Sequence, residues 1–598
     1  MQEFSVPPVV EIGEATNLTD PVWDNATKSP DTVQFSRRTP EGWQDITCAQ
    51  FRDEVTALAK GLVAAGVEPG ERVALMSKTR YEWTLIDYAI WTAGAVTVPI
   101  YETSSAEQVA WILADSQAVA CFVETPAHQE TVAQVRDRVP GLREVWQIDA
   151  GALAELVTGG AAVDDAEVTR RRRLPRADDV ATIIYTSGTT GRPKGCVLTH
   201  RNLYSDIANA VPGLTALFHE GASTLLFLPL AHSFARLIQL GVVHARVRMG
   251  HLPDVKDLVA TLGEFKPTFV LSVPRVFEKV YNTAKQRAHA DGKGRIFDAA
   301  DRTAVAYSEA LERRGGPGLG LRIRHGIFDR LVYGRLRAAL GGECHSAISG
   351  GAPLGARLAH FYRGVGLTVY EGYGLTETSP AVAVNLQHAI KIGTVGRPLP
   401  GVTVRLANDG EILIRGDLVF REYWNNPQAT AEVLDEDGWF HSGDLGELDD
   451  DGFLKITGRK KEIIVTAGGK NVAPAVLEDR LRAHPLISQS MVVGDRQPFI
   501  AVLVTIDEEA WPVWLSEVGL PADSAVADML EHPTLREHIQ HAVDEANLAV
   551  SHAESIKVFR VLPRDWSEET GEITPSLKVK RNVVLKQYAD EIAAIYGG

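Results

Sequence analysis

A run rich in glycine, hydroxyl and basic residues between positions 185 and 195 carries the strongest chemical signal in the sequence. It reads Tyr-Thr-Ser-Gly-Thr-Thr-Gly-Arg-Pro-Lys-Gly and follows an alternating, β-like stretch, Asp179–Tyr185. Glycine lets backbone N–H groups converge on an anion, hydroxyls donate to phosphate oxygens, and basic side chains add positive charge. No Ser or Thr follows Lys194, so this is not a Walker A loop. The run predicts a polyphosphate cradle with these contacts: Thr186, Ser187, Gly188, Thr189, Thr190, Gly191 and Lys194.

Three later segments have the chemistry to bind the rest of a nucleotide. Ser349–Pro353 contains two glycines whose backbone permits close approach of a ligand, although an ordinary β–α turn has the same composition. The Tyr/Gly-rich segment 370–378 ends near Glu377, a single carboxylate of the kind that holds Mg²⁺ together with substrate phosphates. Asp444 lies in a Gly-rich motif, and a carboxylate grips a ribose diol through charge-assisted hydrogen bonds.

Taken in order, these motifs resemble those of the adenylate-forming superfamily, which includes acyl-CoA synthetases, firefly-type luciferases and peptide-synthetase adenylation domains. The resemblance extends over roughly residues 40–590. It implies that Tyr373 stacks on adenine, Thr376 contacts the α-phosphate, Glu377 and Thr190 hold Mg²⁺, and Asp444 binds the ribose. It also implies nucleotide contacts from the neighbouring positions Gly350, Gly351, Ala352, Glu371, Gly372 and Gly374.

Two basic motifs near the C terminus complete the resemblance. In Gly-Arg-Lys-Lys-Glu, Arg459 matches the family's ribose and phosphate contact and Lys461 its hinge residue, while Gly469 and Lys470 match the border of the CoA tunnel. In Pro575–Arg581, the catalytic lysine maps to Lys578, with Lys580 a weaker candidate. Leu577 stands where glycine is common in the family. In this respect the motif resembles that of long-chain acyl-CoA synthetases.

The resemblance also implies the reaction and its substrates. His232 follows a Leu-Pro segment and would border the acyl and adenylate pocket, although a lone histidine is more often structural. The segment Val273–Lys279 resembles long-chain and bubblegum-type acyl-CoA synthetases. The implied activity is an AMP-forming long-chain fatty-acid–CoA ligase that uses ATP, Mg²⁺ and CoA. Two alternatives remain: an acyl-AMP ligase that loads a carrier-protein thiol, and a non-catalytic nucleotide- or lipid-binding relative.

Composition narrows the class of protein. With 61 Lys plus Arg and 77 Asp plus Glu among 598 residues, the net charge is 61 − 77 = −16, which argues against a dedicated nucleic-acid binder. Four cysteines without CxxC spacing favour a reducing compartment and give no zinc motif. No secretory signal and no apolar stretch of about 20 residues is present. We expect a cytoplasmic protein, and peripheral contact with the inner face of a membrane stays open.

Short β-branched runs alternate with helical patterns, which is typical of an α/β chain with largely parallel sheets. The predicted fold is a large N-terminal domain of parallel sheets flanked by helices, with a small β-subdomain, followed by a small mobile α+β lid. The expected parts are an adenylation domain over 1–456, a hinge over 457–461 and a lid over 462–598. Residues 284–340 predict helices with a break at Gly315–Gly320, and the basic run Arg170–Arg173 predicts a solvated loop.

Overall fold

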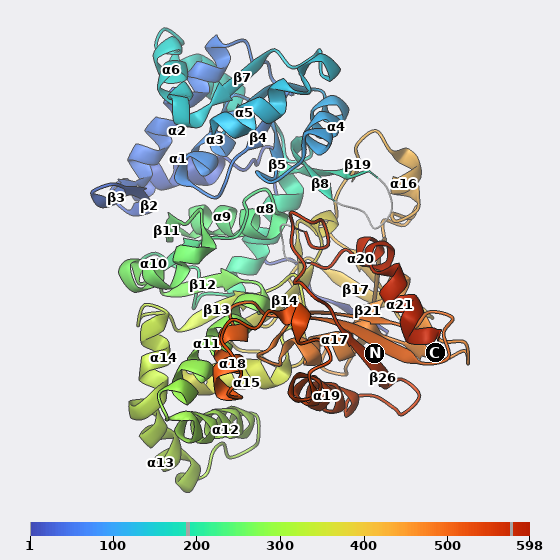
Figure 1. Ribbon diagram of the computed structural model, residues 1–598. Helices are drawn as coiled ribbons and strands as arrows, with labels where there is room; N and C mark the ends of the chain where they lie inside the picture. The colour runs from blue at the N-terminus through green and yellow to red at the C-terminus, as the bar shows by residue number, and fades with distance from the viewer. Residues whose placement is uncertain (1, 187–191, 575–577, 598) are drawn as a thin grey trace.

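The computed structural model describes residues 2–186, 192–574 and 578–597 (Figure 1). In this part of the chain one sheet has seven strands in the order β19-β9-β8-β5-β4-β6-β7. The strands from β8 to β7 are parallel, and β9 and β19 are antiparallel additions at one edge. The strands are β4 (Arg72–Met76), β5 (Val96–Ile100), β6 (Ala118–Val123), β7 (Glu144–Gln147), β8 (Val180–Thr186), β9 (Lys194–Thr199) and β19 (Glu422–Tyr423).

A second sheet has nine strands within the described ranges, in the order β16-β15-β14-β13-β12-β10-β11-β2-β3. Its centre, from β14 to β2, is parallel. The strands are β2 (Val33–Thr39), β3 (Gly42–Thr47), β10 (Ser223–Leu226), β11 (Arg248–His251), β12 (Phe269–Ser272), β13 (Ser346–Ser349), β14 (Thr368–Gly374), β15 (Ala381–Val384) and β16 (Arg397–Pro398).

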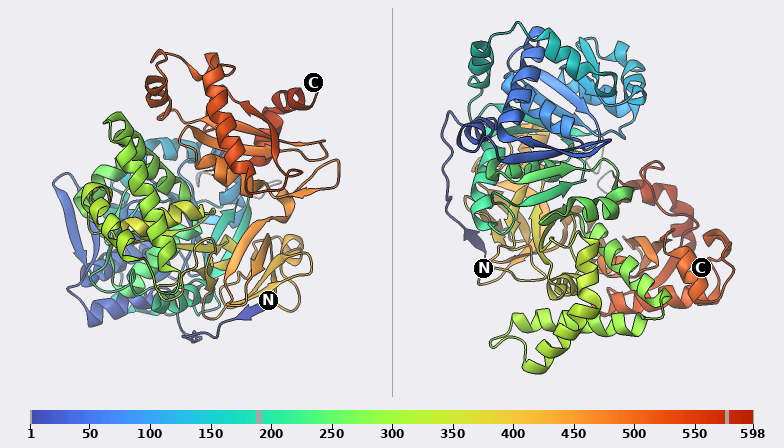
Figure 2. Two further views of the ribbon diagram at one scale, coloured as in Figure 1. Left: turned by 90° about the horizontal axis from the view of Figure 1, so that it is seen from below. Right: turned by 90° about the vertical axis from the view of Figure 1, so that its left-hand side faces the viewer.

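Helices pack around both sheets (Figure 2), and their buried apolar residues form three core clusters with the strands. Helix α3 shows why: its sequence is apolar on all sides, and all but one of its residues are buried. The helices of this region are α1 (Asp20–Lys28), α2 (Cys48–Ala64), α3 (Tyr81–Thr92), α4 (Ala106–Ser116), α5 (Pro126–Ala133), α6 (Ala152–Gly159), α7 (Asp165–Arg172), α8 (His200–Ala210), α9 (Ser233–Ala245), α10 (Leu258–Phe265), α11 (Pro274–Ala290), α12 (Gly294–Leu311), α13 (Leu319–Phe328), α14 (Gly334–Ala339) and α15 (Ala356–Val365).

A small antiparallel sheet and a C-terminal α+β unit follow. The small sheet contains β1 (Glu3–Ser5), β17 (Thr403–Leu406), β18 (Glu411–Arg415), β20 (Phe440–Leu448) and β21 (Leu454–Arg459), with α16 (Pro427–Ala431) nearby in sequence. The C-terminal unit contains β22 (Ile464–Val465), β23 (Asn471–Val472), β24 (Ile487–Val493), β25 (Ile500–Ile506), β26 (Ile556–Val561), α17 (Pro474–Arg482), α18 (Trp511–Glu517), α19 (Pro533–Asn547), α20 (Arg581–Gln587) and α21 (Ala589–Tyr596).

The α/β fold class is as predicted, but one strand was not expected and one local expectation needs correction. The unexpected strand is β9, which pairs antiparallel with β8. The basic run is not a solvated loop: Arg171 and Arg172 are buried at the end of α7, where they bond the Val67 carbonyl and the Asp20 carboxylate. The expected helices over 284–340 are present, interrupted between Leu311 and Leu319.

The connection to the C-terminal unit is short. Strand β21 continues to Arg459, which pairs with Asp444 of β20, and a 3₁₀ turn over Lys460–Glu462 follows at once. No helix in the described residues combines the length and apolarity needed to cross a membrane.

Candidate active site

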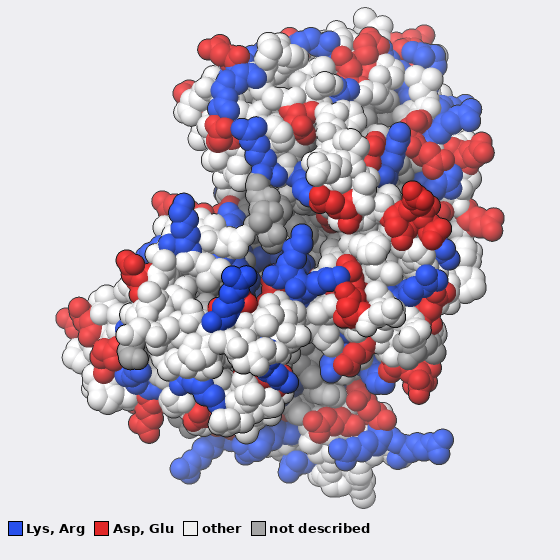
Figure 3. Space-filling view, turned by 90° about the vertical axis from the view of Figure 1, so that its right-hand side faces the viewer, with Lys and Arg blue, Asp and Glu red and all other residues white. Residues whose placement is uncertain are grey.

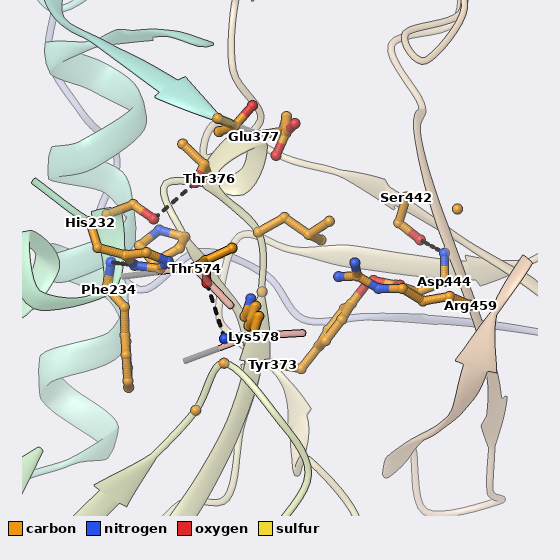
Figure 4. Close-up of a pocket in the computed structure, with 18 of the residues that line it drawn as sticks. His232, Phe234, Tyr373, Thr376, Glu377, Ser442, Asp444, Arg459, Thr574 and Lys578 are labelled. Carbon is orange, nitrogen blue, oxygen red and sulfur yellow. Dashed lines mark hydrogen bonds and ion pairs between the residues drawn. The ribbon is translucent and has the colours of Figure 1, made fainter. Parts of the chain in front are cut away.

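A cavity of about 1900 Å³ lies where the C-terminal unit meets the two large sheets and the small sheet. Its polar part is lined by the β8–β9 hairpin, the start of α9, the end of β14, the turn in β20 and the end of β21 (Figure 4). The segment around Lys578 enters the same cavity from the C-terminal unit. The predicted residues found on the cavity wall are Thr186, Lys194, His232, Gly350, Gly351, Gly372, Tyr373, Gly374, Thr376, Glu377, Asp444, Arg459, Lys461 and Lys578.

Three side chains from separate strands form one hydrogen-bonded group. Tyr373 donates its hydroxyl to Asp444 Oδ2 at 2.7 Å, and Arg459 Nε donates to Oδ1 at 2.9 Å. Ser442 Oγ accepts from the Asp444 backbone N–H at 3.1 Å. Burial and the adjacent Asp444 carboxylate raise the pKa of Tyr373 well above its usual range, so the phenol stays a donor. The group therefore presents an oriented carboxylate at the cavity edge.

A second carboxylate is held by a residue that the sequence analysis missed. Tyr423, on β19, donates to Glu377 Oε1 at 2.6 Å. Lys194 Nζ lies 5.0 Å from the centre of the Tyr423 ring, so the cationic end of the hairpin and the Glu377 carboxylate face the same space. No sequence motif singled out Tyr423, because only the pairing of β19 with β9 brings it to Glu377.

Two glycines beside the cavity lie close to neighbouring groups: Gly374 at the end of β14 and Gly350 directly after β13. A Cβ at Gly374 would lie 1.6 Å from the Pro380 carbonyl oxygen, and one at Gly350 would lie 2.9 Å from the Phe234 ring. Real Cβ atoms do not approach so closely, so Gly374 has no space for a side chain beside this carbonyl, whereas a side chain at Gly350 would require the Phe234 ring to move. Both glycines line the cavity with backbone atoms.

Lys578 lies between His232 on one side and Asp444 and Arg459 on the other (Figure 4). The surrounding protein and, secondarily, the Arg459 guanidinium lower the pKa of Lys578 below its usual value, while Asp444 and Glu377 oppose that shift. Its backbone N–H donates to Thr574 Oγ1 at 3.0 Å, and this bond holds the Lys578 backbone in place.

His232 caps the start of α9. Its Nδ1 accepts from the Phe234 N–H at 3.1 Å. Burial, with Lys578 contributing, lowers the pKa of His232 to about 3, so the ring is neutral. Because Nδ1 accepts, the single proton of the neutral ring is assigned to Nε2. Next to it, Ser233 Oγ and Thr376 Oγ1 are 3.2 Å apart and join α9 to the segment after β14.

The cavity continues into an apolar channel between α8 and α9. Arg236 of α9 forms a fully buried ion pair with Asp87 of α3. This pair holds α9 in position beside the channel. At the far end, Gly241 faces Phe218, whose ring lies 3.0 Å from the position of a Cβ there. The apolar lining consists of Ile207, Ala210, Val211, Leu214, Phe218, Leu237, Ile238 and Gly241.

Four predicted residues do not line the cavity. Glu371 instead accepts from the Leu354 N–H at 2.8 Å, and burial raises its pKa to about 8. Ala352 lies in the turn beside it. Gly469 and Lys470 are exposed on the C-terminal unit, with Lys470 paired to Glu554 at 3.4 Å. Of the polyphosphate cradle, Ser187, Gly188, Thr189, Thr190 and Gly191 lie outside the described residues.

Comparison with known proteins places the chain in a family. The family model "AMP-binding enzyme" matches residues 22–424, and "AMP-binding enzyme C-terminal domain" matches residues 461–598. The chain belongs to the AMP-binding enzyme family. It is 56% identical over 599 residues, the full length of both chains, to "Long-chain-fatty-acid--CoA ligase FadD15" of Mycobacterium tuberculosis.

Several solved structures share the fold. The anthranilate CoA ligase AuaEII in complex with anthranoyl-AMP superposes with a TM-score of 0.74, covering 98% of this chain and 99% of that one at 18% identity. ATP-bound MatB from Rhodopseudomonas palustris superposes with a TM-score of 0.70, covering 97% and 100% at 24% identity. The AMP-binding enzyme described here thus has the fold of proteins that hold ATP or an acyl-adenylate.

Proposed function

We propose that this AMP-binding enzyme is an AMP-forming long-chain fatty-acid–CoA ligase. One observation carries the proposal: a polar, nucleotide-sized site and an apolar channel meet at Lys578 and His232. A carboxylate entering from the channel side would reach the phosphate side only at this junction. The full-length identity to a mycobacterial long-chain-fatty-acid–CoA ligase supports the same activity.

In the first half-reaction, a fatty-acid carboxylate attacks the α-phosphorus of ATP and pyrophosphate leaves. Negative charge builds on the phosphoryl oxygens, so catalysis depends on positioning and on cations aimed at that charge. We assign Lys578 and Lys194 to this stabilisation, with Thr376 at the α-phosphate. Asp444, oriented by Tyr373 and Arg459, would bind the ribose diol.

The magnesium ion that the family uses has a suitable ligand. Tyr423 occupies Glu377 Oε1, which leaves the other carboxylate oxygen for a metal. No cluster of three or more His, Cys, Asp or Glu side chains fit for a metal occurs among the described residues, so phosphate oxygens and water would complete the shell. Thr190 is the proposed second protein ligand. The ion would neutralise phosphate charge during adenylation.

In the second half-reaction, the CoA thiol attacks the acyl carbonyl and AMP leaves. We propose that the C-terminal unit rotates about Lys461, which withdraws Lys578 and brings Gly469 and Lys470 to the thioester side. Their distance from the cavity in the present arrangement fits the adenylation state of such a cycle. The neutral His232 can donate from Nε2 to a carboxylate or adenylate oxygen in either state.

The channel accounts for a long acyl chain. Burial of each CH₂ contributes about 0.8 kcal/mol, and the channel is lined by aliphatic and aromatic side chains.

We further propose a cytoplasmic enzyme in peripheral contact with the inner face of the membrane, where long-chain substrates partition.

The test is to incubate the purified protein with ATP, Mg²⁺ and fatty acids of increasing length, with and without CoA, and to resolve the products by mass. We expect acyl-CoA and AMP, with turnover rising toward long chains. Acyl-AMP that never becomes acyl-CoA would replace the proposal with a carrier-protein loader. No product from any fatty acid would overturn the fatty-acid assignment.

A further inference from the structure

The outward side of helix α13 and of the turn that follows is apolar although it faces solvent. Leu319, Ile323, Ile327 and Leu331 are 76%, 59%, 53% and 53% exposed. Their spacing of four residues places them one above another on a single helix face. Isolated exposed aliphatic residues are common, but a contiguous row of them marks an interaction surface.

The opposite side of the same helix is already packed. His325 lies in a stacked contact with Tyr307 at 3.9 Å between ring centres, and its Nε2 bonds the Gly364 carbonyl at 2.6 Å. Phe328 and Val332 pack on the core beneath. Helix α13, at the lower end of the molecule in Figure 1, is therefore fixed to the body by one face, and the residues of the apolar row are exposed.

Positive charge borders this apolar row. Between Arg313 and Arg337 the sequence has seven arginines and one acidic residue, Asp329, in a chain of net charge −16. Asp329 is paired with Arg337, whereas the other six arginines are exposed and form no ion pair within the described residues. They are Arg313, Arg314, Arg322, Arg324, Arg330 and Arg335. Figure 3 shows basic side chains gathered along the lower edge of the molecule, where α12 and α13 lie.

We propose that α13 and the π-helical turn Asp329–Tyr333 attach this protein to a membrane surface rich in anionic phospholipid. The four aliphatic side chains would enter the boundary between headgroups and acyl chains, and the arginines would bind lipid phosphates beside them. At about 3.6 residues per turn, Arg322 and Arg324 flank the row on its two sides, so both reach the headgroup layer when the row is inserted.

Charge also argues against other occupants of this face. A second copy docked symmetrically would bring the arginine sets of both copies together, and such like-charge contact is unfavourable. A nucleic acid would satisfy the arginines but leave the aliphatic row in water. Helix α13 would thus be the site of the peripheral membrane contact named under Proposed function. Membrane binding is measured without substrates, so its test does not depend on the ligase reaction.

Vesicle flotation of the full-length protein tests the proposal. We expect binding to vesicles of phosphatidylcholine with about one-third phosphatidylglycerol, little binding to phosphatidylcholine alone, and release by high salt. The double variant Ile323→Gln, Ile327→Gln should bind at least tenfold less. Leu548→Gln, which changes an 83% exposed leucine on the C-terminal unit, is the matched control and should bind as wild type. Acyl-CoA formation from a soluble medium-chain acid should be unchanged in all variants.

A fluorescent label gives a second readout that is independent of binding strength. All four cysteines are buried, so a maleimide dye on Ile327→Cys reports this site selectively. We expect its emission to shift to the blue with anionic vesicles, while the dye on Leu548→Cys does not shift. Absence of flotation, equal loss in Leu548→Gln, or an unshifted Ile327→Cys label would overturn the proposal. A concentration-dependent dimer that Ile323→Gln, Ile327→Gln abolishes would instead assign the face to a second copy.

Discussion

At the scale of single residues, the Tyr373 hydroxyl has a purpose beyond the adenine contact that its ring would make. It donates to Asp444 and so orients the carboxylate assigned to the ribose. A hydrogen bond to a charged group contributes about 1.5–3 kcal/mol. We therefore expect Tyr373→Phe to raise the KM for ATP about tenfold or more with a smaller effect on kcat. Tyr373→Leu, which also removes the ring, should be worse. An unchanged KM for ATP in Tyr373→Phe would contradict the orienting role.

Lys578 and Lys580 both line the cavity, so geometry alone does not separate them. Lys578 interacts with Asp444, Glu377 and Arg459, whereas the Lys580 backbone is bonded to Glu572 in the C-terminal unit. We expect Lys578→Ala to reduce adenylation by at least a hundredfold, and thioester formation from preformed acyl-adenylate by much less. Lys580→Ala is the control and should retain adenylation within a few-fold. Equal losses in both half-reactions of Lys578→Ala would remove it as the adenylation lysine.

At the scale of elements, the sequence predicted the helices and strands that have a recognisable local pattern of apolar residues. The β-like stretch Asp179–Tyr185 predicted β8 to within one residue at each end, because a buried strand has a short, largely apolar sequence. Strand β9 was missed because Lys194–Thr199 is short and begins inside the glycine-rich run. The Tyr423–Glu377 contact was missed for another reason: it depends on pairing between strands more than 200 residues apart, which no local pattern encodes.

Helix α9 sets the depth of the acyl channel through Gly241, which faces Phe218. A leucine at this position would fill the end of the channel and exclude the terminal methylenes of a long chain. At about 0.8 kcal/mol per CH₂, exclusion of four methylenes corresponds to a loss of about two-hundredfold. We expect Gly241→Leu to lower kcat/KM for palmitate by that factor and to leave octanoate within about threefold. A parallel loss for both acids would show general damage rather than a shorter channel.

The 3₁₀ turn Lys460–Glu462 is the element about which the C-terminal unit is proposed to rotate. Lys460 pairs with Asp409 and Glu411 beside the small sheet, whereas Lys461 forms no ion pair within the described residues. Proline at 461 restricts φ to about −65° and so limits that rotation. We expect Lys461→Pro to adenylate nearly normally but to form acyl-CoA at least tenfold more slowly. Lys461→Ala is the control, and normal acyl-CoA turnover in Lys461→Pro would exclude this hinge.

At the scale of the whole molecule, the two parts meet through a cluster of charged residues. Arg275 of α11 donates to Asp507 at 2.8 Å and to Ser488 at 3.3 Å, and Lys279 pairs with Glu509 at 2.6 Å. Beside these pairs, carboxylates of both parts face one another. They are Glu278 and Glu371 on the body and Glu478 and Asp479 on α17. Arg482 lies among them, Arg275 pairs with Glu278, and Arg581 pairs with Glu478.

This arrangement couples the position of the C-terminal unit to pH. Burial, with Glu478 and Glu278 close by, raises the pKa of Asp479 to about 7, although Arg482 opposes the shift. Rotation of the unit would hydrate Asp479 and return its pKa toward the ordinary value near 4. The present arrangement therefore binds a proton more tightly than the rotated one. Its population should fall as pH rises from about 5 to 7, and it should level off above that, because both arrangements are then ionised.

The distance between spin labels on Leu548→Cys of the C-terminal unit and Leu174→Cys of the body measures this population directly, since the native cysteines are buried. Glu278→Gln removes one negative charge opposite Asp479 and so should lower the pKa of Asp479 and move the transition to lower pH. Lys279→Gln breaks only the exposed pair with Glu509. It should lower the population of the present arrangement without changing the pH at which that population falls. A label distance that is constant between pH 5 and 8 would mean that these carboxylates do not govern the rotation.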